Sequence, residues 1–359
     1  MIIECDDTIY YPLGGASYIF KNNFMKYIAS KIKKDNVIIS IGAQPNSSPH
    51  LGTLCVFSLA FLLAKELRYI KPKLNVEVLF EVVDTAPAEI IEINGIKYQK
   101  DLKTSETMKN VFPEYEEILD YYSKSFNVKY IIRMQKEFNS LKEVKEVDLF
   151  ILDHLDEIAK ALDPDAGRLR MRIPCPICGL TDKNGINNKY DGYIITSSCP
   201  YHGEFKTNVE TQSHLLEYNT PLRNLVRAIA YAKLNASTSF DSEYVRITGN
   251  EYAGFYQEQL MYMVASRFEF DFKSLPMIVY CPMITDWSGA KISKSLYVKE
   301  GAYNDLPLYL QNYRGLKAQF GEKGLEIVST ITSEWLKNPE KLFRDYSIFY
   351  IKNRFEEYL

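Results

Sequence analysis

Lys291-Ile292-Ser293-Lys294-Ser295 is a short stretch whose residue types suit the binding of a polyphosphate. It follows the strand-like run 277–280 and a turn marked by Gly289. The two lysines can stabilise the charge that develops on the β- and γ-phosphates of a nucleotide as pyrophosphate leaves, and the serines can add hydrogen bonds. Taken alone, the stretch also fits a solvated loop, because runs of charge usually lie on the surface.

A second segment, His50-Leu51-Gly52-Thr53, stands where a predicted strand over 36–42 gives way to a predicted helix over 50–68. Ligands of open α/β sheets bind at the carboxyl ends of strands, and the first turn of a helix attracts phosphate. His50 is placed to donate a hydrogen bond to phosphate, and Gly52 leaves space for a base or ribose. The alternative is a purely structural role, in which the segment is a prolyl turn with a helix-capping histidine. The preceding loop adds Gln44, Pro45 and Asn46 as candidates for nucleotide binding.

Four metal-type ligands occur as two pairs, each with two residues between its members: Cys175 with Cys178, and Cys199 with His202. Such gaps place both ligands of a pair on one tight turn, and two turns complete a tetrahedron. Four protein ligands leave no open position, so the pattern predicts a structural zinc ion rather than a catalytic one. The other cysteines stand alone and are expected to be buried apolar thiols.

Alternating strand and helix patterns predict a doubly wound α/β fold with a parallel sheet. A segment rich in Gly, Pro, Asn, Asp and Cys, 163–204, interrupts the pattern as a zinc-ribbon insertion, and a small helical C-terminal region ends the chain. The predicted strands cover 36–42, 76–83, 128–134, 244–249 and 277–280, and the predicted helices 50–68, 103–126, 141–162, 221–234 and 254–268. The corresponding units are 1–165, 166–206, 207–300 and 301–359.

Composition narrows the classes of protein that fit. The chain has 359 residues, a net charge of −3 and a pI of about 6.0, so its overall charge does not indicate a nucleic-acid partner. The N-terminal residues lack a signal-peptide pattern, and the longest apolar run, 56–64, is too short to span a bilayer. We therefore expect a cytoplasmic protein that does not associate with membranes. The sequence shows no catalytic triad, glycosidase carboxylate pair or Walker loop.

The lysine loop and the histidine segment together resemble the paired signatures of class I aminoacyl-tRNA synthetases. Three further stretches are similar to the class I lysyl-tRNA synthetases: the ribbon at 174–203, a Leu-Pro-Trp-Arg-like segment at 218–223 and the segment 247–254. The chain also departs from that family. Leu222 replaces the tryptophan, Thr53 replaces the last residue of the first signature, and Gly249-Asn250-Glu251-Tyr252 replaces Gly-Lys-Asp-His.

This resemblance implies a Rossmann-like domain of the nucleotidyltransferase superfamily that joins ATP and an amino acid as an aminoacyl-adenylate and releases pyrophosphate. His50, Lys291 and Lys294 would be catalytic, Mg²⁺ would accompany ATP, and the aminoacyl group, with lysine favoured, would pass to tRNA. The residues implied to bind ATP are Gln44, Pro45, Asn46, His50, Gly52, Thr53, Gly249, Lys291, Ser293, Lys294 and Ser295, and those implied to bind the amino acid are Asp84, Glu251, Tyr252 and Gln257.

Several alternatives stay open. Only residues 296–359 follow the lysine loop, where the family carries a large anticodon-binding region, so a shortened paralogue that serves a non-tRNA acceptor also fits. A related nucleotidyltransferase and a regulatory module without activity are the other readings. A lysine substrate would need a carboxylate, for which Glu81, Glu243 and Glu251 are candidates. Asp84 fits a strand-end turn equally well.

Overall fold

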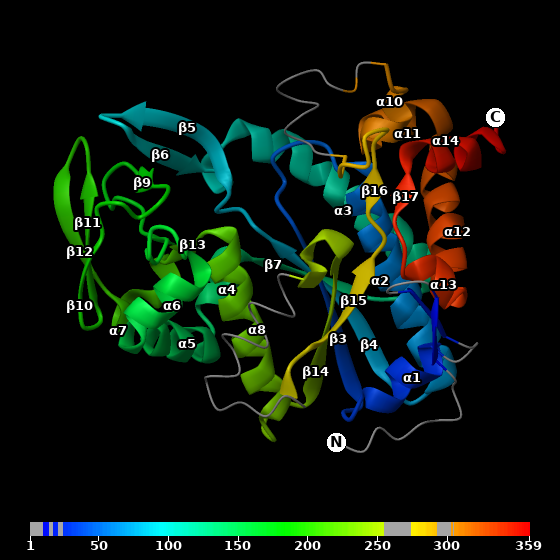
Figure 1. The fold of residues 1–359 in the computed structure, drawn as a ribbon, viewed down its shortest axis with the longest axis horizontal. Helices are drawn as coiled ribbons and strands as arrows, with labels where there is room; N and C mark the ends of the chain where they lie inside the picture. Colours follow the sequence, from blue (N-terminus) through cyan, green and yellow to red (C-terminus); the bar gives the residue numbers. More distant parts are fainter. Residues whose placement is uncertain (1–9, 14–16, 21–23, 255–273, 293–302, 304) are drawn as a thin grey trace.

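Five parallel strands form the central sheet of the computed structural model, which describes residues 10–13, 17–20, 24–254, 274–292, 303 and 305–359 (Figure 1). The spatial order is β15-β14-β3-β4-β7, so the strand order reverses between β3 and β14. This is the doubly wound arrangement expected from the sequence, and ligands of such sheets bind at the reversal. The strands are β3 (Asn36–Ala43), β4 (Asn75–Val82), β7 (Tyr130–Met134), β14 (Ser242–Gly249) and β15 (Met277–Cys281).

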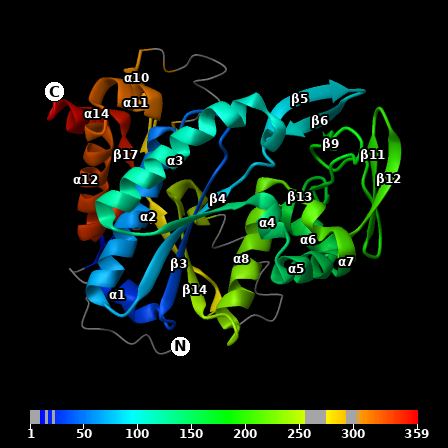
Figure 2. The ribbon, with the colours of Figure 1, turned by 180° about the vertical axis from the view of Figure 1, so that it is seen from behind.

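Helices cover both faces of this sheet (Figures 1 and 2). Val37, Ile39 and Ile41 of β3 belong to one core, whereas Ile38 packs against the other, because successive strand residues point to opposite faces. The first core is covered by α1 (Phe24–Lys31), α2 (Leu51–Ile70) and α3 (Glu106–Phe126). The second is covered by α4 (Gln135–Asn139), α5 (Lys142–Asp153), α6 (Leu155–Leu162) and α8 (Thr220–Ala236).

Two of the predicted helices are not found as single helices among the described residues. The predicted helix over 141–162 is two helices, α5 and α6, which meet at His154, whose backbone (φ −118°, ψ 33°) is not helical. The predicted helix over 254–268 lies outside the described residues except for Gly254. The remaining predicted strands and helices of the sheet occur with boundaries shifted by a few residues.

A hairpin after β4 was not anticipated from the sequence. It consists of β5 (Pro87–Ile93) and β6 (Ile96–Asp101), joined by Asn94 and Gly95 at φ 52° and 76°. An Asn-Gly pair between two extended segments is the usual signal for a two-residue hairpin turn, because both residues tolerate positive φ. The hairpin pairs with β9 (Thr181–Asp182) of the inserted segment, so the insertion is attached to the end of β4.

The inserted segment is a set of short antiparallel strands on the side of the molecule away from the C-terminal helices (Figure 1). It includes β8 (Met171–Arg172), which pairs with β13 (Glu217–Tyr218), and the three-stranded sheet of β10 (Lys189–Asp191), β11 (Ile194–Cys199) and β12 (Gly203–Asn208). The short helix α7 (Val209–Gln212) leads out of it toward α8. A separate hairpin, β1 (Tyr10–Leu13) with β2 (Ser17–Phe20), precedes α1.

The C-terminal region packs directly on α2 and shares its core (Figures 1 and 2). Thr332 and Ser58, both fully buried, form a hydrogen bond of 2.7 Å between α12 and α2. The region comprises α10 (Leu308–Gln311), α11 (Tyr313–Phe320), α12 (Lys323–Lys337), α13 (Pro339–Leu342), β17 (Tyr346–Ser347), which pairs with β16 (Ile284–Thr285), and α14 (Ile348–Glu356). Within the part of the chain that is described, no helix has the length and apolar character needed to cross a membrane.

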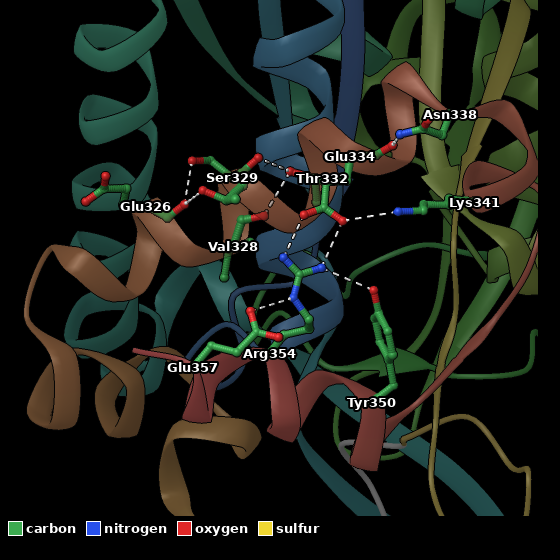
Figure 3. A network of polar contacts seen from close by, with 11 residues as sticks. Glu326, Val328, Ser329, Thr332, Glu334, Asn338, Lys341, Tyr350, Arg354 and Glu357 are labelled. Carbon is green, nitrogen blue, oxygen red and sulfur yellow. Dashed lines mark hydrogen bonds and ion pairs between the residues drawn. The ribbon is translucent and has the colours of Figure 1, made fainter. Parts of the chain in front are cut away.

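A polar network joins the last helix to α12 (Figure 3). Arg354 of α14 donates two hydrogen bonds to Glu334, at 2.9 and 2.6 Å, and a third to Glu357 at 3.2 Å. Its guanidinium also lies within 3.2 Å of the Tyr350 hydroxyl. The hydrogen bonds from Arg354 lower the pKa of Glu334. A two-pronged arginine–carboxylate contact fixes orientation as well as distance, so this network sets how α14 lies on α12.

We predict that Arg354→Gln lowers the free energy of unfolding by about 1 kcal/mol, as expected for a well-formed ion pair that is partly exposed. Lys352→Gln on the same helix is the control, because its 3.5 Å pair with Glu356 is more exposed. Urea denaturation followed by circular dichroism measures both variants. Equal, small effects of the two substitutions would contradict a special role for Arg354.

Candidate active site and metal centre

A cavity of about 310 Å³ opens at the carboxyl ends of β3 and β14, where the strand order reverses. Sites for small molecules commonly have volumes of about 300–1,000 Å³ and occur at such reversals. Residues from the histidine segment, from the end of β14 and from the lysine loop all line it. Those predicted from the sequence are Gln44, Asn46, His50, Gly52, Thr53, Gly249, Glu251, Tyr252 and Lys291.

The first turn of α2 forms one wall of the cavity. His50 is the N-cap of this 20-residue helix, and its carbonyl accepts hydrogen bonds from the backbone N–H groups of Thr53 and Leu54. A Cβ atom at Gly52 would lie only 3.0 Å from the His50 ring, so glycine lets the imidazole fold over the helix start. The arrangement presents an imidazole and the positive end of a long helix to the same cavity, which suits an anionic group.

The loop before α2 is held from two other elements. The Tyr115 hydroxyl of α3 lies 3.4 Å from the Gln44 carbonyl, and the backbone N–H of Tyr313 donates to the Pro49 carbonyl at 2.8 Å. His50 also forms an isolated antiparallel bridge with Asn312. The C-terminal region therefore fixes the backbone on which the predicted phosphate-binding segment stands.

Lys291 reaches the cavity because Asp286 shapes the turn before it. The Asp286 carboxylate accepts hydrogen bonds from the backbone N–H groups of Ser288 and Ala290, at 2.8 and 3.2 Å, and from the Ser288 hydroxyl. Gly289 in this turn has φ +82°, a conformation that glycine adopts without strain. Hydrogen bonds from Ser288 lower the pKa of Asp286. The turn returns the chain so that Lys291 bridges Thr285.

The Lys291 ammonium is ion-paired with Glu251, and it lies 6.0 Å from the centre of the Tyr252 ring. These three residues bring the end of β14 and the lysine loop together at the cavity mouth. The pair is partly exposed, with 39% of the Lys291 side chain accessible, so an incoming phosphate can compete for the lysine. Ser293, Lys294, Ser295 and Gln257, also predicted as site residues, lie outside the described residues.

Two predicted residues are described but do not line the cavity. Pro45 is buried in the loop between Gln44 and Asn46. Asp84 is 6% exposed and accepts a hydrogen bond of 3.3 Å from the backbone N–H of Gln135. Burial raises the pKa of the Asp84 carboxyl. The contact with Gln135 matches the structural alternative that the sequence left open for Asp84, in which it bonds a nearby backbone amide.

The cavity floor holds arginines that sequence reasoning did not place in the site. Arg223 and Arg227, four apart on α8, and Arg246 of β14 line the cavity and are 3–6% exposed. Behind them Glu81 of β4 is ion-paired with Arg227 and Arg133 and accepts a hydrogen bond from Tyr231. One feature of the sequence could have indicated this cluster: a charged residue within an apolar strand, such as Glu81 between Phe80 and Val82. Such a charge is buried only when it is paired, so it predicts a buried partner of opposite charge.

These contacts bear on the carboxylates considered for a lysine substrate. Burial alone would raise the pKa of Glu81, but Arg227, Arg133 and Arg246 lower it to about 2, so this carboxylate is ionised and already neutralised. Glu243 accepts hydrogen bonds from the backbone N–H groups of Lys33 and Lys34. These two residues precede the first residue of β3, whereas the cavity lies at the other end of that strand. Among the described lining residues, Glu251 is the single carboxylate, and Lys291 is its partner.

Cys175, Cys178, Cys199 and His202 converge, with their ligand atoms within 4.8 Å of one another. The Cys178 and Cys199 sulfurs are 3.6 Å apart, and Nδ1 of His202 lies 3.5 Å from the Cys199 sulfur. Ligands at zinc bond lengths on a tetrahedron are separated by about 3.5–3.8 Å. The donor set and its spacing therefore fit a structural zinc ion.

Each pair of ligands sits on a turn of the same sequence type, Cys-Pro-x-ligand-Gly. Gly179 and Gly203 close the two turns at φ +72° and +76°. In the first turn the N–H of Gly179 donates to the Cys175 carbonyl at 2.8 Å, and in the second Gly203 pairs with Cys199 as β12 begins. Positive φ at the residue after each second ligand bends the chain back, which explains glycine at both places.

Comparison with known proteins gives distant likenesses only. No protein-family model and no curated protein matches the sequence. Among solved structures, the chain is similar to a protein from Campylobacter jejuni described as an arginyl-tRNA synthetase, with 10% identity over 92% of this chain and 72% of that chain, at a TM-score of 0.37. It is also similar to a glutamate-tRNA synthetase from Elizabethkingia anophelis, with 11% identity over 74% of this chain and a TM-score of 0.35. The matched part is about half (54%) of that chain. We base the proposed function on the site itself.

We predict one zinc ion per chain, measured by elemental analysis of protein purified without added metal. Cys178→Ser should lose the ion because a neutral hydroxyl is a poor replacement for a thiolate ligand. Cys55→Ala removes a cysteine buried in the α2 core and should keep full zinc content. A folded wild-type protein without metal would contradict the assignment.

The Glu81 cluster predicts a specific acid sensitivity. Because the pKa of Glu81 is about 2 in the folded protein and about 4.3 in an unfolded chain, its stabilising contribution is complete above pH 5 and is lost as the pH falls toward 2. We expect Glu81→Gln to lower the free energy of unfolding at pH 7 by about 3–5 kcal/mol, because buried arginines lose their counter-ion.

Denaturation curves between pH 2 and 7 measure this, with Glu77→Gln on the same strand as the control. Glu77 is only half-buried, so its substitution should change the free energy of unfolding by less than about 0.5 kcal/mol. The slope of stability against pH should flatten in the Glu81 variant. An unchanged slope would rule out Glu81 as the source of acid sensitivity.

Proposed function

We propose that this protein activates an amino acid with ATP, forming an aminoacyl-adenylate and releasing pyrophosphate, as a ligase of the class I aminoacyl-tRNA synthetase type. One observation carries the proposal. The first turn of α2 with His50, Gly52 and Thr53, and the lysine loop with Lys291, are far apart in the sequence and line one cavity at the sheet reversal. The alternative, a related nucleotidyltransferase, would share the histidine segment. The complete lysine loop in the sequence favours the amino-acid-activating enzyme.

The reaction follows from the charges at this end of the cavity. The amino-acid carboxylate attacks the α-phosphorus of ATP, a bond from oxygen to phosphorus forms, and the bond to the bridging oxygen of pyrophosphate breaks. Negative charge moves onto the departing β- and γ-phosphates. The α2 amides, His50 and Lys291 supply hydrogen bonds and positive charge there, which is electrostatic stabilisation rather than proton transfer.

Mg²⁺ would accompany ATP and reduce the repulsion between its phosphates. Lys291 is ion-paired with Glu251, so binding of the nucleotide would exchange one anionic partner of the lysine for another. The proposed zinc ion has no part in this chemistry, because its four protein ligands leave no position for substrate.

The acceptor of the activated amino acid is a separate part of the proposal, with tRNA as the first candidate. Transfer to tRNA follows from the resemblance of the two signature segments, and an enzyme that serves another acceptor fits the same cavity. Lysine was the amino acid that the resemblance favoured. Glu251 is the single carboxylate among the described residues that line the cavity, and it is already ion-paired with Lys291. Little negative charge is therefore left for the ammonium of a lysine substrate, and the proposal does not depend on lysine.

We predict amino-acid-dependent exchange of pyrophosphate into ATP, and a loss of roughly 100- to 1,000-fold in its maximal rate for Lys291→Ala. The amino-acid KM should change little, because Lys291 acts on the leaving phosphates. Lys337→Ala, on the exposed end of α12, is the matched control and should leave both constants unchanged. Lys294→Ala should behave like Lys291→Ala.

The assay should include every standard amino acid, with and without bulk tRNA, since an acceptor can complete a binding site. No exchange under any condition would contradict the proposed activity. An equal loss in rate and in amino-acid binding for Lys291→Ala would contradict the role assigned to this residue in the transition state.

A further inference from the structure

The end of the cavity away from α2 is strongly cationic. Arg223 and Arg227 come from α8 and Arg246 from β14, and each side chain is at least 94% buried. α2 and α8 cover opposite faces of the sheet (Figures 1 and 2). Residues from the start of both helices line the cavity, His50 before α2 and these two arginines on α8. A buried guanidinium is costly unless an anion accompanies it.

Among the described residues, few carboxylates are placed to neutralise these three arginines. Glu81 is one carboxylate shared between Arg227 and Arg133, and it also attracts Arg246. Glu217, the next carboxylate, lies near Arg223, but burial and the neighbouring Asp101 raise its pKa to about 8. Burial therefore disfavours the charged form of Glu217, which makes it a poor counter-ion for Arg223.

Arg223 shows the resulting deficit. Burial and the nearby Arg172 lower the pKa of its guanidinium to about 9, although Glu217 acts in the opposite direction. One of its nitrogens, Nη2, donates to the Tyr218 carbonyl at 2.7 Å, which fixes the position of the side chain. Its Nε and Nη2 of Arg227 are buried and have no hydrogen-bond acceptor among the described residues. Buried donors of this kind are normally satisfied, so the described residues do not use the full hydrogen-bonding capacity of these two guanidinium groups.

We propose that the cavity binds an amino acid whose side chain ends in a carboxylate, aspartate or glutamate, and that Arg223 and Arg227 bind that carboxylate. This inference rests on the proposed function for its substrate class and specifies the side chain. An arginine guanidinium matches a planar carboxylate, because it donates two parallel N–H hydrogen bonds to the two carboxylate oxygens. A lysine ammonium in the same place would face three guanidinium groups with like charge, which disfavours it.

The α8 arginines are distinct from the groups assigned to the phosphates. His50, Gly52 and Thr53 belong to the start of α2, and Lys291 to the loop beyond β15. If Arg223 and Arg227 instead bound the phosphates of ATP, their replacement would weaken the binding of ATP rather than the binding of the amino acid. The two assignments therefore give opposite kinetic results.

The first test uses the wild-type protein and needs no substitution. Titration calorimetry measures binding of aspartate, glutamate, asparagine, glutamine and lysine in the presence of ATP, and pyrophosphate exchange is measured with the same five. We expect an acidic amino acid to bind at least 10-fold more tightly than its amide, because the amide lacks the charge that the arginines need. Preference for lysine or for an amide would overturn the inference and leave amino-acid activation intact.

Binding of an acidic amino acid without exchange would support the inference and contradict the proposed activity. No binding of either acidic amino acid would overturn the inference, whatever the exchange assay gives. The binding readout therefore separates failure of the substrate assignment from failure of the activity.

The second test uses Arg223→Gln and Arg227→Gln. Each should raise the KM for the acidic amino acid roughly 10- to 100-fold while the KM for ATP changes less than about twofold. Lys233→Gln is the control, since Lys233 lies on the same helix but pairs with Glu146 outside the cavity. A raised KM for ATP with an unchanged KM for the amino acid would assign the arginines to phosphate and overturn the inference. Should either variant fail to fold, the wild-type measurements decide.

Discussion

The buried carboxylate of Glu81 is the interaction on which the pocket depends. It lies on β4 in the middle of the sheet and joins Arg133 at β7 with Arg227 and Tyr231 of α8. A charge in this position is stable only if its partners stay close, so the sheet and its covering helix are held in one arrangement. Arg227 also lines the cavity floor, so one ion pair contributes both to the packing of the fold and to the charge of the pocket.

The opposite end of the cavity is supported in a different way. The start of α2 is held through backbone contacts from the C-terminal region, including the bridge between His50 and Asn312 and the hydrogen bond from Tyr313 to Pro49. The turn at Asp286 positions Lys291, and it follows β16, which pairs with β17 of the C-terminal region. Three supports that are distant in the sequence therefore meet at one cavity, which is the usual consequence of building a site at the reversal of a doubly wound sheet.

Patterns with a local cause could be predicted from the sequence. β3 and β4 were recognisable because buried parallel strands are β-branched runs, and the cluster of three cysteines and His202 because its spacing is set by two turns. The contact of Tyr313 with Pro49 has no local signal, since it joins segments that only the finished fold brings together. The Asn94-Gly95 hairpin had a clear signal that was overlooked. Arg223 and Arg227 were visible as charges on α8, but the burial of Arg227 depends on Glu81, and Arg223 is held by the Tyr218 carbonyl, both of which belong to other elements.

The packing of α12 on α2 also has a consequence for the order in which the chain is made. α2 carries an almost continuous apolar surface, and α12 covers part of it through contacts such as Thr332 with Ser58. A ribosome adds roughly 5–20 residues per second, so this surface waits on the order of ten seconds to a minute before its cover is synthesised. The nascent chain is therefore most exposed to aggregation or chaperone capture during that interval, and the residues that hold the loop before α2, Asn312 and Tyr313, emerge only shortly before α12.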